Sequence, residues 1–244
     1  MTPLARQALA CLDLTRLDDA CTEADVDALC QRACTPFGPV AAVCVWPRFV
    51  ARARARVPAA VRVAAVANFP AGGTDVAAVQ AEVGRIADAG GDEVDLVLPW
   101  RALRAGDLAA CARLVAAARR AAGPLGLKVI LETGELATAA HIAAASRLAL
   151  AEGADFLKTS TGRVPVGATP QAAAVMLAEI AADPAARHRV GFKASGGVRT
   201  LAEAAGYLQQ VAQVLGTEAV TPARCRLGAS ALLDELLTAL APAG

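Results

Sequence analysis

Short apolar segments alternate with longer, alanine-rich segments along the whole chain. Each short segment is rich in β-branched or other apolar residues and ends on a polar or glycine-rich tip, which is typical of a buried strand. The longer segments carry apolar residues at helical spacing. This pattern predicts eight strands, at Leu9–Thr15, Val40–Trp46, Val61–Phe69, Glu93–Pro99, Leu127–Thr133, Ala154–Ser160, Val190–Ser195 and Arg224–Ala229.

The order of these segments predicts a (β/α)8 TIM barrel. Successive strands are separated by about one strand-and-helix unit, and the length of 244 residues suits one such barrel. We therefore expect a single barrel domain over residues 1–244. An open, doubly wound sheet would show the same alternation. The absence of a GxGxxG fingerprint and the number of parallel strands favour closure.

Three of the helices have starts that can be predicted from capping residues. Threonine is a favoured N-cap, proline is favoured at the first helical position, and a glutamate three residues after the cap completes a capping box. The predicted starts are Thr74, before a helix that stops at Gly90-Gly91, Thr169 followed by Pro170, and Thr200 with Glu203.

Composition and charge exclude several classes of protein. With 56% hydrophobic and 19% charged residues, the chain has enough apolar side chains for a large core, which excludes a disordered protein. The net charge of +1 gives no reason to expect nucleic acid or an anionic membrane as a partner. Charges interrupt every apolar run before the roughly 20 residues that span a bilayer. Without a recognisable export signal, the chain is predicted to be cytoplasmic.

Neither cysteine nor histidine usage suggests a metal or a disulfide framework. The seven cysteines are an odd number without a CxxC pair, which suits reduced thiols. The two histidines, His141 and His188, have no neighbouring carboxylates at metal-ligand spacing. We expect no metal and no cofactor.

Lysine usage gives the first indication of chemistry. Of 24 basic residues only Lys128, Lys158 and Lys193 are lysines, and lysine, unlike arginine, can lose its proton near neutral pH. Lys158 and Lys193 end predicted strands, so both are expected at the C-terminal mouth of the barrel, where such barrels place their chemistry. Repulsion between two ammonium groups would leave one amine free to form an imine with a carbonyl. Two independent lysines, each paired with a carboxylate, remain the alternative.

Asp95 is the predicted partner of these lysines. Glu93 and Asp95 share one face of their strand, whereas Val94 and Leu96 lie on the other. If the carboxylates face inward, Asp95 lies near the mouth and can move protons through a water molecule. A buried counter-ion is the alternative role, and the two roles are compatible.

Glycine-rich segments follow three neighbouring strands and suggest a phosphate site. Glycine lets a ligand approach the backbone closely, and barrels often bind phosphate with the loops after strands seven and eight. The segments are TSTGR, ASGG and GAS, and the candidate phosphate-binding residues in them are Thr161, Gly162, Arg163, Gly196, Gly197, Gly228 and Ser230.

Together these motifs resemble those of the deoxyribose-phosphate aldolases, a family of class I aldolases. The resemblance extends almost from end to end. It rests on CLDLTRL (11–17), VCVWPRFV (43–50), VANFPAGG (66–73), DEVDLVLPW (92–100), LKVILETGEL (127–136), GADFLKTSTGR (153–163), GFKASGGVRT (191–200) and RLGAS (226–230).

The resemblance implies reversible cleavage of 2-deoxy-D-ribose 5-phosphate to D-glyceraldehyde 3-phosphate and acetaldehyde, without a cofactor. Lys158 matches the Schiff-base lysine, and Lys193 matches the second lysine, whose charge lowers the pKa of the first. Asp95 matches the aspartate that moves protons. The implied partners are a sugar phosphate and an aldehyde. Family members are often dimers, so a homodimer is one expectation, although one sequence does not define the oligomeric state.

Three further residues fall in matching blocks. Asp13 and Thr15 lie in the block that lines the substrate site, where a short polar side chain would bind a substrate hydroxyl; a cap or turn role is the alternative. Cys44 matches a thiol that aldehyde products attack in relatives. For normal function, a small buried strand residue is the simpler interpretation.

The chain also departs from the family pattern. Arg163 replaces the usual lysine, and Ala231 replaces the second serine of the final turn, which removes a donor worth about 1 kcal/mol. The chain ends in APAG, without the C-terminal tyrosine of some relatives. Two other functions stay open at this point: an imine-forming aldolase for a different sugar phosphate, and a non-catalytic barrel that binds a sugar phosphate.

Overall fold

The computed structural model describes residues 2–242, in which eight parallel strands close into a barrel. Around the barrel, β4, β5, β6, β7, β8, β9 and β10 follow β1 in order, and β10 pairs back with β1. The predicted (β/α)8 barrel is therefore confirmed. The strands are β1 (Leu12–Thr15), β4 (Ala42–Val45), β5 (Arg62–Ala67), β6 (Glu93–Val97), β7 (Gly126–Ile130), β8 (Phe156–Lys158), β9 (Gly191–Ser195) and β10 (Cys225–Ala229). Seven of them lie inside the predicted segments, and β7 begins one residue earlier.

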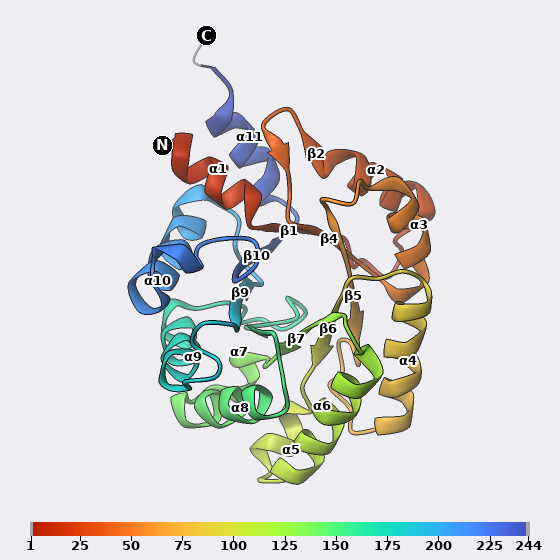
Figure 1. Cartoon of the computed structure of the whole chain (residues 1–244), viewed down its shortest axis with the longest axis vertical. Helices are drawn as coiled ribbons and strands as arrows, with labels where there is room; N and C mark the ends of the chain where they lie inside the picture. The colour runs from red at the N-terminus through yellow and green to blue at the C-terminus, as the bar shows by residue number, and fades with distance from the viewer. Residues whose placement is uncertain (1, 243–244) are drawn as a thin grey trace.

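Helices surround the strands, as Figure 1 shows. Neighbours along the ring pack on one another, among them α4 with α6 and α8 with α9. No helix between residues 2 and 242 has both the length and the apolar character needed to cross a membrane. The helices are α1 (Thr2–Ala10), α2 (Glu23–Arg32), α3 (Val50–Arg56), α4 (Val76–Asp88), α5 (Trp100–Arg104), α6 (Leu108–Ala122), α7 (Thr133–Leu136), α8 (Ala139–Ala151), α9 (Pro170–Ala182), α10 (Leu201–Leu215) and α11 (Leu232–Leu240), with short 3-10 turns at Pro47–Phe49 and Thr217–Ala219.

The chain begins with a helix that the sequence pattern did not predict. The first strand was expected from Leu9, but Leu9 and Ala10 belong to α1 and the strand starts at Leu12. Ala5, Ala8 and Leu9 are buried at the i, i+3, i+4 spacing of one helix face. α1 packs against α11, and the two lie side by side in Figure 1. A small antiparallel hairpin, β2 (Cys34–Thr35) with β3 (Gly38–Pro39), was also not predicted.

Two of the three predicted caps are confirmed. Thr169 accepts a hydrogen bond from the backbone N–H of Ala172 at the start of α9, and Pro170 is the first helical residue. Thr200 and Glu203 form the expected capping box of α10, with both reciprocal hydrogen bonds present. These starts were readable because each cap uses side chains within three residues of one another.

The predicted cap of α4 is wrong by one residue. Asp75, not Thr74, accepts the backbone N–H of Ala78 at 3.0 Å, and the helix starts at Val76. Both residue types are good caps, but the carboxylate of aspartate also interacts favourably with the positive end of the helix dipole.

Replacing Asp75 with alanine should therefore destabilise the fold, whereas replacing Thr74 should not. We expect Asp75→Ala to lower the free energy of unfolding by about 1 kcal/mol, because the N–H of Ala78 loses its partner. Urea unfolding of both variants measures this difference. Equal effects of Asp75→Ala and Thr74→Ala would contradict the observed cap.

Candidate active site

Lys158 and Lys193 end up side by side inside the barrel. The two residues are register partners on the neighbouring strands β8 and β9, so their side chains point to the same face of the sheet. The Nζ atoms of Lys158 and Lys193 lie 2.7 and 2.8 Å from the same oxygen, Oδ2 of Asp95 on β6. All three residues are buried. The structure thus brings together the two lysines and the aspartate that the sequence had singled out.

The third lysine contacts the same carboxylate, that of Asp95. Lys128 on β7 is the register partner of Asp95, and its Nζ lies 2.8 Å from Asp95 Oδ1. It also donates to Glu93, which lies two residues earlier on β6. Asp95 is therefore surrounded by three amines, two on one oxygen and one on the other.

The remaining charges continue this network toward the N-terminal end of the barrel. Arg226 on β10 donates to Glu93 Oε1 and to Asp13 Oδ1, each at 2.7 Å. Asp13, on β1, also accepts a hydrogen bond from Lys193. We use the name buried charge cluster for these seven residues: Asp13, Glu93, Asp95, Lys128, Lys158, Lys193 and Arg226.

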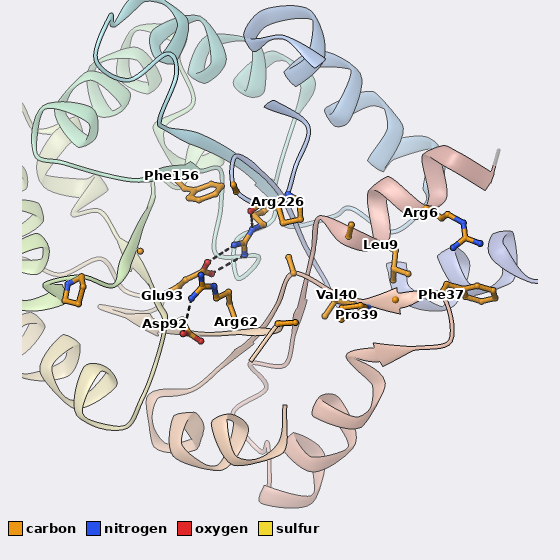
Figure 2. Close-up of a pocket in the computed structure, with 18 residues that line it drawn as sticks. Arg6, Leu9, Phe37, Pro39, Val40, Arg62, Asp92, Glu93, Phe156 and Arg226 are labelled. Atoms are coloured by element: carbon orange, nitrogen blue, oxygen red, sulfur yellow. Dashed lines mark hydrogen bonds and ion pairs between the residues drawn. The ribbon is translucent and has the colours of Figure 1, made fainter. Parts of the chain in front are cut away.

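A pocket of about 600 Å³ lies at the N-terminal end of the barrel, below the cluster. Figure 2 shows Arg226 and Glu93 pointing toward each other in this pocket, with Phe156 beside them. The guanidinium carbon of Arg226 is 5.4 Å from the ring centroid of Phe156. At this end the cluster therefore terminates in an arginine that cannot lose its proton.

The two aspartates of the cluster stay ionised. Burial tends to raise the pKa of Asp95, but the positive charges of Lys128, Lys158 and Lys193 outweigh it and hold the pKa well below the usual value. For Asp13 burial again opposes ionisation, and the charges of Lys193 and Arg226 outweigh it, so that this pKa is also lowered. Both carboxylates are therefore ionised at neutral pH.

The pKa values of Lys158 and Lys193 are shifted in opposite directions. Burial favours the neutral form of both. For Lys193 the charges of Asp13 and Asp95 overcome burial, and its pKa is raised. For Lys158 burial is the largest influence, Asp95 opposes it and Lys193 reinforces it, so the pKa of Lys158 is lowered. The predicted repulsion by Lys193 is thus one part of the cause, and removal from water is the larger part.

The number of charges in the cluster independently indicates that Lys158 is the neutral amine. The buried charge cluster holds four potential cations, Lys128, Lys158, Lys193 and Arg226, against three carboxylates. An unbalanced charge in a buried site is costly, and a buried group commonly neutralises by shifting its pKa. One amine without its proton balances the cluster. Lys158 is the amine with a single carboxylate contact, whereas Lys128 and Lys193 each contact at least two.

A second cavity, of about 700 Å³, opens at the mouth above Lys158. The three glycine-rich segments line it together, which confirms that they converge on one place. Thr15 and Arg199 line it too, and Arg199 had not been singled out in the sequence. The candidate phosphate-binding residues found at this cavity are Thr161, Gly162, Arg163, Gly196, Gly197, Gly228 and Ser230.

Two of these candidates have their donors engaged within the protein. The backbone N–H and the hydroxyl of Thr161 both donate to the carboxylate of Glu132. The guanidinium of Arg163 donates to the backbone carbonyl of Leu17 and to Asp19, the latter at 3.0 Å. Arg163 therefore bridges the loop after β8 to the loop after β1 across the mouth.

Glu132 is a residue of the site that sequence reasoning missed as a functional group. It follows β7 and has a left-handed backbone conformation, with φ 60° and ψ 58°. A residue other than glycine in this conformation costs about 1–3 kcal/mol, which the surroundings must offset. Its side chain is buried. The only sequence signal was an acidic residue at the tip of an apolar strand.

Asp13, Thr15 and Cys44 differ in what the structure offers them. Asp13 has both carboxylate oxygens paired within the cluster, so its position fits a counter-ion rather than a ligand for a substrate hydroxyl. The hydroxyl of Thr15 donates to the backbone of Asp13 at the edge of the mouth cavity. Cys44 is fully buried, and burial raises the pKa of its thiol to about 11. A thiol in this form is a poor nucleophile.

Gly228 is required by close packing inside the barrel, apart from any role in binding phosphate. A Cβ at this position would lie 2.8 Å from Cβ of Ser195 and 3.0 Å from Cε of Lys193. Only a residue without a side chain lets β10 pass this close to the Lys193 side chain.

The fold and the site together define a (β/α)8-barrel enzyme with buried amines below its C-terminal mouth. A family model described as DeoC/LacD family aldolase matches residues 8–236. The chain belongs to this family of aldolases and is an aldehyde-lyase.

Individual relatives agree with this assignment. A curated deoxyribose-phosphate aldolase from Agrobacterium fabrum (strain C58 / ATCC 33970) is 48% identical over 240 residues, covering 97% of this chain and 92% of that protein. A crystal structure of a candidate deoxyribose-phosphate aldolase from Coccidioides immitis has a TM-score of 0.85 and 30% identity, over 96% of this chain and 86% of that one. The corresponding candidate from Toxoplasma gondii ME49 has a TM-score of 0.89 and 28% identity, over 98% and 94% of the two chains.

The close contact at Gly228 predicts a specific sensitivity to side-chain size. Gly228→Ala should lower the free energy of unfolding by about 1–3 kcal/mol, because the added carbon forces Ser195 and Lys193 to move. Gly206→Ala is the matched control: nothing lies within 4 Å of a Cβ there, and alanine should stabilise α10 by about 0.5–1 kcal/mol. Denaturant unfolding distinguishes the two. A stable Gly228→Ala variant with unchanged activity would contradict the close approach.

Proposed function

We propose that the enzyme reversibly cleaves 2-deoxy-D-ribose 5-phosphate into D-glyceraldehyde 3-phosphate and acetaldehyde through a Schiff base on Lys158. The observation that carries this proposal is the buried charge cluster, in which four potential cations face three carboxylates and Lys158 has the lowered pKa. The relative from Agrobacterium fabrum, whose name gives the substrate class, supports it.

The first part of the proposed reaction joins the substrate to Lys158. The neutral amine adds to the aldehyde carbon C1 of the open-chain sugar and forms a carbinolamine, whose hydroxyl leaves as water to give an iminium ion. Asp95 accepts the proton that the nitrogen loses, because its carboxylate is ionised and Oδ2 is 2.7 Å from Lys158 Nζ. Lys193 remains charged beside them and opposes protonation of the free amine.

The second part breaks the C2–C3 bond. A proton leaves the C3 hydroxyl, the electrons of the C2–C3 bond move toward the iminium nitrogen, and glyceraldehyde 3-phosphate departs. The remaining two-carbon enamine takes a proton at C2, and water then hydrolyses the resulting iminium to acetaldehyde and free Lys158. We assign the proton steps to Asp95, whose Oδ2 lies 2.7 Å from Lys158 Nζ, and to water.

The substrate phosphate is proposed to bind in the mouth cavity. The glycine-rich loops after β8, β9 and β10 surround this cavity together with Lys158. Glycines at Gly162, Gly196 and Gly197 have positive φ, which suits loops whose backbone amides turn toward an anion. Arg163 and Arg199 add positive charge at the rim.

Borohydride trapping tests the assignment of Lys158. With acetaldehyde and borohydride, the wild-type protein should gain one reduced adduct, located on Lys158 by peptide mass spectrometry. Lys158→Arg should lose both the adduct and at least about 10³-fold in turnover, because guanidinium keeps the charge but does not form an imine. An adduct on another lysine, or substantial turnover by Lys158→Arg, would refute the assignment.

Varying the charge count of the cluster tests why Lys158 is neutral. Activity needs the unprotonated amine, so the rate rises with pH through the pKa of Lys158. Lys128→Met removes one cation, leaves three against three, and should raise this pKa and move the rising limb by about one unit to higher pH. Glu93→Gln removes an anion and should move the limb to lower pH.

These two variants also control for each other. A general structural defect would lower the rate at every pH without moving the limb. The proposed charge balance would be contradicted if the rising part of the pH profile moved in the same direction in both variants. It would also be contradicted if the profile of the folded variants did not move. The comparison is made as kcat/KM against pH for the cleavage reaction.

A further inference from the structure

Glu132 holds Thr161 with both oxygens of its carboxylate. The backbone N–H of Thr161 donates to Oε1 at 3.1 Å, and its hydroxyl donates to Oε2 at 2.6 Å. The same hydroxyl accepts the backbone N–H of Arg163 at 3.0 Å. Because a hydroxyl has one proton and here accepts from Arg163, that proton is directed to Glu132. Both carboxylate oxygens therefore serve as acceptors for one residue.

The hold on Thr161 extends to the next loop of the mouth. The loop after β8 contacts the loop after β9 through two glycines, Gly167 and Gly196. A Cβ on Gly167 would lie 2.2 Å from the carbonyl oxygen of Gly196. The backbone N–H of Ala168 donates to that same oxygen at 2.9 Å. Since no side chain separates the two loops at this contact, a displacement of one moves the other.

We propose that Glu132 is a positioning residue for the substrate phosphate, acting through Thr161 on the loops after β8 and β9. The inference rests on the function proposed above and names a residue that sets recognition of the phosphate monoester rather than the carbon chemistry. Glu132 holds the Thr161 N–H and hydroxyl, so that the mouth cavity is left to the following glycines and to Ser230.

Two features explain why an acidic side chain serves next to an anion site. The two donors of Thr161 each meet a different oxygen of the carboxylate, whereas an amide in the same place would turn its NH2 toward one of them. The carboxylate is buried rather than directed into the mouth, since Glu132 is about 1% exposed and does not line the cavity. Burial raises the pKa of Glu132 and the Thr161 hydrogen bonds counteract this. The left-handed backbone of Glu132 then sets the direction in which the side chain leaves β7.

Glu132→Gln is the direct test, with Glu135→Gln, on the short helix α7 that follows Glu132, as the matched control. The probe is inorganic phosphate, titrated calorimetrically into the full-length protein. We expect Glu132→Gln to weaken phosphate binding about tenfold, because the amide replaces one acceptor by a donor facing Thr161. Glu135→Gln should bind phosphate as the wild type does. Equal phosphate affinity of wild type and folded Glu132→Gln overturns the proposal.

The kinetic readout separates positioning from a general structural defect. In Glu132→Gln the KM for 2-deoxyribose 5-phosphate should rise about tenfold, whereas kcat/KM for unphosphorylated 2-deoxyribose should fall much less. An equal loss for both sugars means that the residue only supports the fold, and the proposal fails.

A second pair of variants keeps the test valid if Glu132→Gln does not fold. Thr161→Val removes the hydroxyl that Glu132 holds and should weaken phosphate binding, and Thr161→Ser should restore it. Equal phosphate affinity of the valine and serine variants overturns the proposal. Failure of the proposed function is distinguishable, because borohydride trapping with acetaldehyde involves no phosphate and is read on Lys158.

Discussion

The site depends on one carboxylate that is shared by three amines. Asp95 accepts Lys158 and Lys193 on one oxygen and Lys128 on the other, inside a barrel from which water is largely excluded. Such an arrangement is stable only because Glu93 and Asp13 compensate Lys128 and Lys193, and Arg226 compensates those carboxylates in turn. The one positive charge in excess therefore falls on Lys158, which contacts a single carboxylate among the described residues. The proposed nucleophile, Lys158, is therefore distinguished by its place at the end of a chain of ion pairs rather than by one neighbour.

Close packing of the backbone makes this network possible. β10 passes Lys193 at a glycine, Gly228, and the loops of the mouth touch one another at Gly162, Gly167 and Gly196. These contacts leave no room for side chains, and at Gly228 the missing side chain leaves space for Lys193, which reaches Asp95. The strands carry the charged side chains, and the glycines allow the backbone to pack closely around them. Close packing and the arrangement of the site therefore constrain the same positions.

The sequence was sufficient for the barrel and for choosing the lysines and Asp95 that the structure brings together, for clear physical reasons. Strand periodicity and strand-end position depend on local patterns, and three lysines among many arginines stand out without any structure. Arg226 and Glu132 did not stand out as functional residues, because their importance comes from partners 133 and 29 residues away, Glu93 and Thr161. The Thr74 prediction was wrong because two adjacent residues were both good caps. Helix α1 was missed because its short apolar face runs directly into the first strand.

The departures from the family pattern take on a specific meaning in this geometry. Arg163 reaches the loop after β1, where Leu17 and Asp19 hold it, so it links two sides of the mouth as well as contributing charge. Both hydrogen bonds come from one guanidinium nitrogen, Nη2, so a single group joins the two loops. At the last turn Ala231 offers no hydroxyl, but the glycine-rich loops line the cavity, and we propose that Glu132 positions them through Thr161. In the proposed phosphate site, recognition thus relies more on how the loops are held than on individual side-chain donors.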